Sequence, residues 1–167
     1  MQPEPVVRSI PLFAISLFAI LFAVPPCQAQ FSGSADSSAS AFSIPQSQLI
    51  QPEALNRLVQ PGATRPLVLQ VGSHVMYSQA HIPGSLYAGP GSQPAGLQLL
   101  DGTVAKSPKN KFIVLYCGCC PWNHCPNVGP AYKRLRDLGF TNVRVLYLAN
   151  NFGDDWVYKG YRVEQGQ

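Results

Sequence analysis

The sequence contains few charged residues. Asp, Glu, Lys and Arg together make up 12% of its 167 residues, and the formal net charge is +4. It has no block of Lys and Arg and no run in which basic and aromatic residues alternate. Nucleic-acid-binding surfaces need such positive charge, so the sequence predicts no nucleic-acid partner.

Long apolar runs are also missing. The longest, residues 11–24 (PLFAISLFAILFAV), falls short of the roughly 20 residues that a membrane-spanning helix needs. Arg8 precedes this run, two prolines end it, and small residues follow up to Ala29, which is the order of a secretory signal peptide. We therefore predict a signal peptide over residues 1–29, cleaved after Ala29, and a periplasmic or extracellular protein. Retention of the segment as a membrane anchor is the alternative.

The rest of the chain is predicted to form a linker and one domain. Residues 30–46 (QFSGSADSSASAFSIPQ) are rich in Ser, Ala and Gly and carry little large apolar surface, which is typical of a flexible linker. Residues 47–167 are long enough for a single domain with a modest core. Sixteen prolines and fourteen glycines argue against a helical bundle.

Short apolar runs alternate with stretches of helical spacing, which predicts an α/β fold with a mostly parallel central sheet flanked by helices. Residues 79–89 are expected to form a loop, and residues 90–111 to be irregular except for one helical turn. The predicted strands are residues 48–50, 67–71, 112–116 and 142–148, and the predicted helices are residues 52–59, 129–140 and 153–163.

The cysteines are concentrated in one place. Cys27 lies in the predicted signal peptide, and the other four are Cys117, Cys119, Cys120 and Cys125. A small exported fold that depends on disulfides would spread its cysteines along the chain. Their concentration in a single loop favours a functional site.

Cys117 follows directly on the predicted strand 112–116, and a helix is expected to begin near Val128. In such folds ligands gather at the carboxyl ends of the strands. Loop amides and a helix N-terminus favour an anion there, so they lower the pKa of a thiol and make it nucleophilic. Cys117 is therefore the predicted catalytic residue. The alternative is a buried thiol that packs as a small apolar group.

Three interpretations remain open for Cys119, Cys120 and Cys125. They could be resolving thiols that attack an oxidised Cys117. They could form a structural disulfide that holds the loop, with Cys125 bonded to Cys119 or Cys120. With His124 they could also bind a thiophilic metal such as copper or zinc, although no standard zinc spacing is present and we expect no cofactor.

Five further residues in or near the loop are candidates for binding an anion or lining the pocket. Gly118 offers a backbone amide, Trp122 a large apolar surface and His124 a titratable ring. Lys133 and Arg134 lie in the first turns of the predicted helix and would supply positive charge. For both, a solvated helix face is the alternative.

Three segments resemble the rhodanese superfamily in order and spacing over residues 47–163. They are LVLQVGSHVMYSQAHIPGSLYAG (67–89), FIVLYC (112–117) and LGFTNVRVLYLANNFGDDWVYKGYRV (138–163). The resemblance implies a rhodanese-like fold and a sulfurtransferase in which Cys117 carries a sulfane sulfur as a persulfide. It also implies a small sulfur-containing substrate or a thiol acceptor protein as partner, and a turn-stabilising role for His81.

The chain departs from the family pattern around this site. The loop after Cys117 is longer than usual, and Trp122 and Asn123 stand where an anion-binding Arg is expected. Gln70 and Gly72 stand where the first strand usually ends in Asp and Arg. The alternative function is therefore a non-enzymatic module for thiol-redox chemistry or thiophilic-metal binding, built on the same fold.

Overall fold

The computed structural model describes residues 43–166. The predicted signal peptide (1–29) and most of the predicted linker lie outside the described residues. Ile44, near the end of that linker, is buried against the core, so the packed unit begins at least three residues before residue 47. Within the described residues, no helix is long and apolar enough to cross a membrane.

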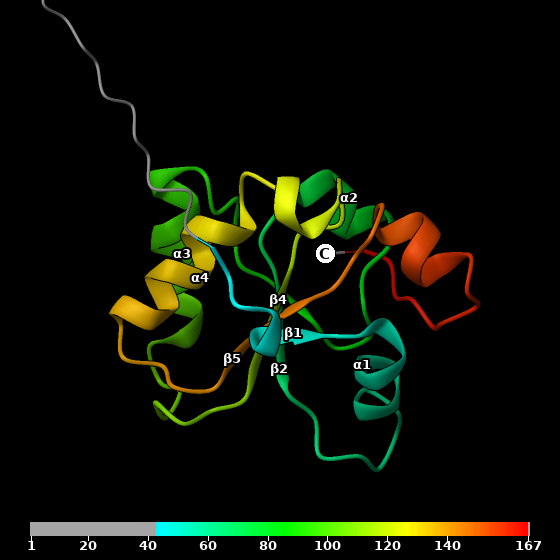
Figure 1. Cartoon of the computed structure of the whole chain (residues 1–167), viewed down its shortest axis with the longest axis horizontal. Coiled ribbons are helices and arrows are strands. Elements are labelled where there is room, and N and C mark those ends of the chain that lie inside the picture. The colour runs from blue at the N-terminus through cyan, green and yellow to red at the C-terminus, as the bar shows by residue number, and fades with distance from the viewer. Residues whose placement is uncertain (1–42, 167) are drawn as a thin grey trace, which may run out of the picture. The chain divides into compact units, whose positions relative to one another are not determined.

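A five-stranded sheet forms the centre of the domain (Figure 1). The strand order is β1-β5-β4-β2-β3, and every pair of neighbours is parallel. This confirms the predicted α/β class. The strands are β1 (Leu49–Ile50), β2 (Leu67–Gln70), β3 (Leu86–Tyr87), β4 (Ile113–Tyr116) and β5 (Val143–Leu146).

Four α-helices connect the strands: α1 (Pro52–Leu58), α2 (His74–Gln79), α3 (Pro94–Val104) and α4 (Val128–Asp137). Short helical turns lie at Gln46–Gln48, Trp122–His124 and Gly153–Val157. The prediction that residues 90–111 are irregular except for one helical turn was only partly right, because α3 occupies eleven of them. The loop predicted over residues 79–89 was also partly wrong, since it contains β3, which pairs with β2 at the edge of the sheet.

Alternate residues of each strand serve opposite faces of the sheet. On one face, Ile113 and Leu115 of β4 join a cluster with Leu100 of α3 and Leu135 of α4. On the other face, Val114 and Tyr116 join a cluster with α1 and with the turn Gly153–Val157. Figure 1 shows α3 and α4 together on one side of the sheet, with α1 on the other.

The central strand β4 leads into the cysteine loop. All four of its residues are buried, because β5 and β2 pair with its two edges and helices cover both faces of the sheet. The backbone N–H of Val71 donates to the carbonyl of Tyr116, at 2.8 Å, so β2 and β4 stay paired up to the start of the loop. The residue that follows is Cys117, at the carboxyl end of the most enclosed strand.

Candidate functional site

A cavity of about 280 Å³ opens at the carboxyl end of β4. Cys117 lines it, together with Gly118 and Cys119 of the loop, and Met76 and Phe152 supply apolar walls. Cys117 is only 3% exposed, so its sulfur reaches solvent mainly through this cavity. The predicted nucleophile therefore lines a pocket large enough for a small molecule.

A glycine shapes the turn after Cys117. Gly118 has a φ of +96°, in the left-handed region that favours glycine. A Cβ at this position would lie 3.1 Å from the Cβ of Phe152, whose N–H donates to the Gly118 carbonyl at 3.0 Å. The turn folds the chain back on itself, and the sulfur atoms of Cys117 and Cys119 lie 3.3 Å apart.

Several donors converge on the Cys117 sulfur. The Cys125 thiol is the strongest influence, followed by the backbone N–H of Cys119, the side-chain amide of Asn127 and the Cys119 thiol. The Asn127 amide nitrogen lies 3.4 Å from the sulfur. Hydrogen bonds to the thiolate outweigh burial, which acts in the opposite direction, and lower the pKa of Cys117 to about 6. Cys117 is therefore mainly a thiolate at neutral pH.

The neighbouring thiols keep their protons. Partial burial and hydrogen bonds to Cys120 and Cys117 raise the pKa of Cys119 to about 12. The hydrogen bond to Cys117 also raises the pKa of Cys125, and burial adds to that effect. Among these three cysteines the negative charge therefore lies on Cys117, and Cys119 and Cys125 act as hydrogen-bond donors to it.

Asn127 is a site residue that the sequence analysis missed. Its side-chain oxygen accepts hydrogen bonds from the backbone N–H of Ser92, at 3.0 Å, and from the Ser92 hydroxyl, at 2.7 Å. These bonds turn its amide nitrogen toward Cys117. Its position directly before α4 was the available signal, because that end of the helix faces the strand ends.

Gln70, the last residue of β2, and Gly72, two residues further on, pack beside Cys117. The buried Gln70 amide donates to the Cys117 carbonyl at 2.9 Å and accepts from the Gly72 N–H at 3.1 Å. A Cβ on Gly72 would lie 2.8 Å from the Cys117 sulfur. In the sequence both residues appear only as departures from the family pattern, whereas the structure shows that they pack directly against Cys117.

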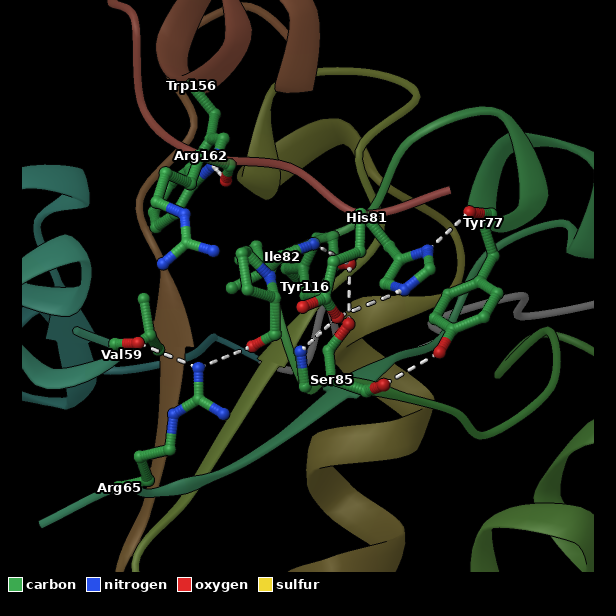
Figure 2. Close-up of polar contacts among 12 residues, drawn as sticks. Val59, Arg65, Tyr77, His81, Ile82, Ser85, Tyr116, Trp156 and Arg162 are labelled. Carbon is green, nitrogen blue, oxygen red and sulfur yellow. Dashed lines mark hydrogen bonds and ion pairs between the residues drawn. The ribbon is translucent and has the colours of Figure 1, made fainter. Parts of the chain in front are cut away.

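A buried polar network supports Tyr116, the residue before the nucleophile (Figure 2). Its hydroxyl accepts from the Ile82 N–H at 3.1 Å and lies 3.2 Å from the Ser85 hydroxyl. His81 stacks on Tyr77, with ring centroids 4.0 Å apart, and its Nδ1 lies 2.8 Å from the Tyr77 carbonyl oxygen. His81 is buried in this packing, as expected for a residue that stabilises the turn.

The remaining loop candidates lie outside the cavity lining. Trp122 is partly buried and donates its backbone N–H to the Leu148 carbonyl at 3.0 Å, which ties the loop to the chain after β5. His124 is exposed. Cys120 packs against the core, with its sulfur 3.0 Å from that of Cys119.

The two basic candidates of α4 are engaged in ion pairs. Lys133 lies 2.7 Å from Asp137 on the same helix. Arg134 makes two hydrogen bonds to the carboxylate of Asp101, one of them at 2.8 Å, and so connects α4 to α3. Neither residue lines the cavity.

Three of the thiols are close enough to share a metal ion. The sulfur atoms of Cys117, Cys119 and Cys125 lie within 4.8 Å of one another. Thiolate donors suit soft ions such as copper(I) or zinc. Cys120 and His124, which the sequence analysis also proposed as ligands, do not belong to this group. All four cysteines of the loop are free thiols.

Comparisons with known proteins agree with this architecture. Residues 51–148 match the family model described as the rhodanese-like domain. No curated protein matches the chain.

Three solved structures illustrate the likeness. The BH2092 protein of Bacillus halodurans is 24% identical, with a TM-score of 0.56 over 71% of this chain and 77% of its own. A rhodanese-like domain of an Anabaena protein is 20% identical, with a TM-score of 0.51 over 71% and 79%. A single-domain sulfurtransferase of Saccharomyces cerevisiae is 16% identical, with a TM-score of 0.52 over 71% and 93%. At these identities, the likeness shows the shared fold.

Proposed function

Because the chain belongs to the family of rhodanese-like domains, we propose that it is a sulfurtransferase in which Cys117 carries a sulfane sulfur as a persulfide. The observation that supports this most directly is the state of Cys117. It combines a thiolate at neutral pH with a position in the lining of an open cavity, which are the properties a sulfur-accepting nucleophile needs.

The transfer takes two steps. The Cys117 thiolate attacks the outer sulfur of a donor, the donor's sulfur–sulfur bond breaks, and the remainder leaves with the electron pair. The Cys117 persulfide then projects into the cavity, where an acceptor thiolate attacks its terminal sulfur. That attack forms the acceptor persulfide and returns Cys117 as a thiolate, whose low pKa makes it a good leaving group.

The cavity lining favours a donor of low charge. None of the described residues that line it is Lys, Arg or His, and its polar groups are amides, Tyr116 and thiols. Entry of a dianion such as thiosulfate would strip its hydration without a cation in return, which is costly. We therefore propose small organic persulfides as donors and a thiol, free or on a protein, as the acceptor.

Acid quenching directly after mixing with an organic persulfide tests this proposal. The full-length protein should gain about 32 Da, the mass of one sulfur atom. Cys117→Ser should gain nothing and lose at least about 100-fold in the rate of transfer to a thiol. At equal concentration the organic persulfide should react faster than thiosulfate. Persulfide formation on Cys117→Ser would contradict the assignment of the nucleophile.

Export is a further part of the proposal. It rests on the signal-peptide pattern of residues 1–29, which lies outside the described residues. The intact mass of protein recovered from the periplasm or medium of a bacterial host should correspond to a chain that begins at Gln30.

The alternative is a non-enzymatic module that binds a thiophilic metal. The close approach of the Cys117, Cys119 and Cys125 sulfurs favours it. Metal analysis of protein purified without chelators would support this function if copper or zinc were present in a one-to-one ratio and no sulfur transfer occurred.

A further inference from the structure

We propose that Cys119 is a resolving cysteine, which attacks the Cys117 persulfide, releases hydrogen sulfide and leaves a Cys117–Cys119 disulfide. This inference rests on the proposed persulfide chemistry of Cys117. It adds a second outcome to that chemistry, in which the chain itself reduces the bound sulfur when no external acceptor takes it.

The first support is the geometry of the turn at Gly118. The Cys119 sulfur lies 3.3 Å from the Cys117 sulfur, close enough for direct contact. A disulfide bond is about 2.05 Å long, so a movement of little more than one ångström joins the two atoms. The glycine at φ +96° makes this approach available to residues only two apart in sequence.

The short distance also selects the atom that is attacked. In the persulfide, the inner sulfur is the Cys117 sulfur itself, and the terminal sulfur lies beyond it. Cys119 is already in contact with the position of the inner sulfur. Attack there displaces the terminal sulfur as sulfide, whereas attack on the terminal sulfur would merely move the persulfide to Cys119.

Exposure distinguishes Cys119 from the other two thiols. Cys125 is 8% exposed and does not line the cavity, so a disulfide that it formed with Cys117 would be shielded from reductants. Cys120 lies outside the group of three sulfurs around Cys117. Cys119 is exposed and also lines the cavity, so it can reach both the persulfide and an external reductant.

The step balances in atoms and electrons. The Cys119 sulfur bonds to the Cys117 sulfur as the persulfide bond breaks, and Cys119 passes its proton to the departing terminal sulfur. The terminal sulfur takes the electron pair and the proton and leaves as hydrogen sulfide. The sulfane sulfur is thereby reduced, and the two cysteines are oxidised to a disulfide. A thiol or dithiol reductant then returns both cysteines to thiols by exchange, and completes the cycle.

A single-turnover experiment on the full-length protein tests this step. Reduced protein receives one equivalent of a small organic persulfide, without other thiols, and is then left to stand. The wild type should first gain about 32 Da and then become about 2 Da lighter than the reduced protein. One equivalent of sulfide should be released above a Cys117→Ser blank.

Variants distinguish a failure of the resolving role of Cys119 from a failure of the proposed persulfide chemistry of Cys117. Cys119→Ser and Cys119→Ala should keep the added sulfur and release at least about tenfold less sulfide, whereas the matched Cys120→Ser should behave like the wild type. Sulfide release with disulfide formation in both Cys119 variants would overturn the resolving role, and so would a stable persulfide in the wild type. Sulfur uptake by neither wild type nor Cys119 variants would overturn the proposed function, and this inference with it.

Discussion

At the scale of single residues, the acidity of Cys117 comes from neighbours within its own loop. The Cys125 thiol is the main donor, and the Cys119 N–H and the Asn127 amide assist it. No Lys or Arg is among these partners. Hydrogen bonds to a thiolate lower its pKa as an opposite charge does. They do so here although no described residue that lines the cavity carries a positive side chain.

The rate at which Cys117 reacts with an alkylating agent should therefore rise at a lower pH than the rate of an ordinary thiol. With a pKa of about 6, the thiolate is half formed at that pH, so the rate should rise from about pH 5 and level off above about pH 7. Cys125→Ala removes the largest stabilising contact and should move the midpoint upward, toward the ordinary thiol value. At pH 7 the rate should fall about two- to tenfold. Peptide mass spectrometry of the labelled loop measures the rate.

Cys120→Ala is the control for that shift, since Cys120 is absent from the partners of Cys117. Its midpoint should match that of the wild type. An unchanged midpoint in Cys125→Ala would show that the thiol–thiolate contact does not set the acidity of Cys117.

At the scale of elements, the sequence predicted those parts whose signal is local. The buried strands read as apolar runs, and the amphipathic helix α4 showed helical spacing. Only one turn of α3 was predicted, because the helix contains Gly96 and Gly102, which disfavour helices. Likewise, the sequence placed the cysteines in one loop, but which sulfurs meet depends on the turn at Gly118, a tertiary feature.

The two glycines of α3 should respond to substitution in opposite directions. A Cβ on Gly96 would lie 2.0 Å from the Pro90 carbonyl oxygen, whereas a Cβ on Gly102 would meet nothing within 4 Å. Gly96→Ala should therefore lower the free energy of unfolding by about 2 kcal/mol or more. Gly102→Ala should raise it by about 0.5–1 kcal/mol, because alanine favours the helix. Denaturant unfolding of the full chain measures both changes, and equal effects would contradict close packing at Gly96.

At the scale of the whole molecule, the sheet brings distant segments together around one cysteine. Gln70 comes from the end of β2, Asn127 from the start of α4, and Phe152 from the segment after β5. Each lies near the carboxyl edge of the sheet, where parallel strands deliver their loops. The site therefore forms only when these distant segments are folded together, and it should be lost when the domain unfolds.

The boundary of that domain gives the last prediction. Among residues 43–166, which the structure describes, the members of the two core clusters run from Ile44 to Val163. A chain that begins at Ser43 should therefore unfold at the same denaturant midpoint as the full chain. A chain that begins at Gln51 loses β1, which pairs with the β5 residues Val145 and Leu146, and two buried isoleucines. It should be about 3–6 kcal/mol less stable, since each buried isoleucine contributes about 1.5–3 kcal/mol. Equal midpoints for the two truncations would show that β1 adds nothing to the fold, despite its burial.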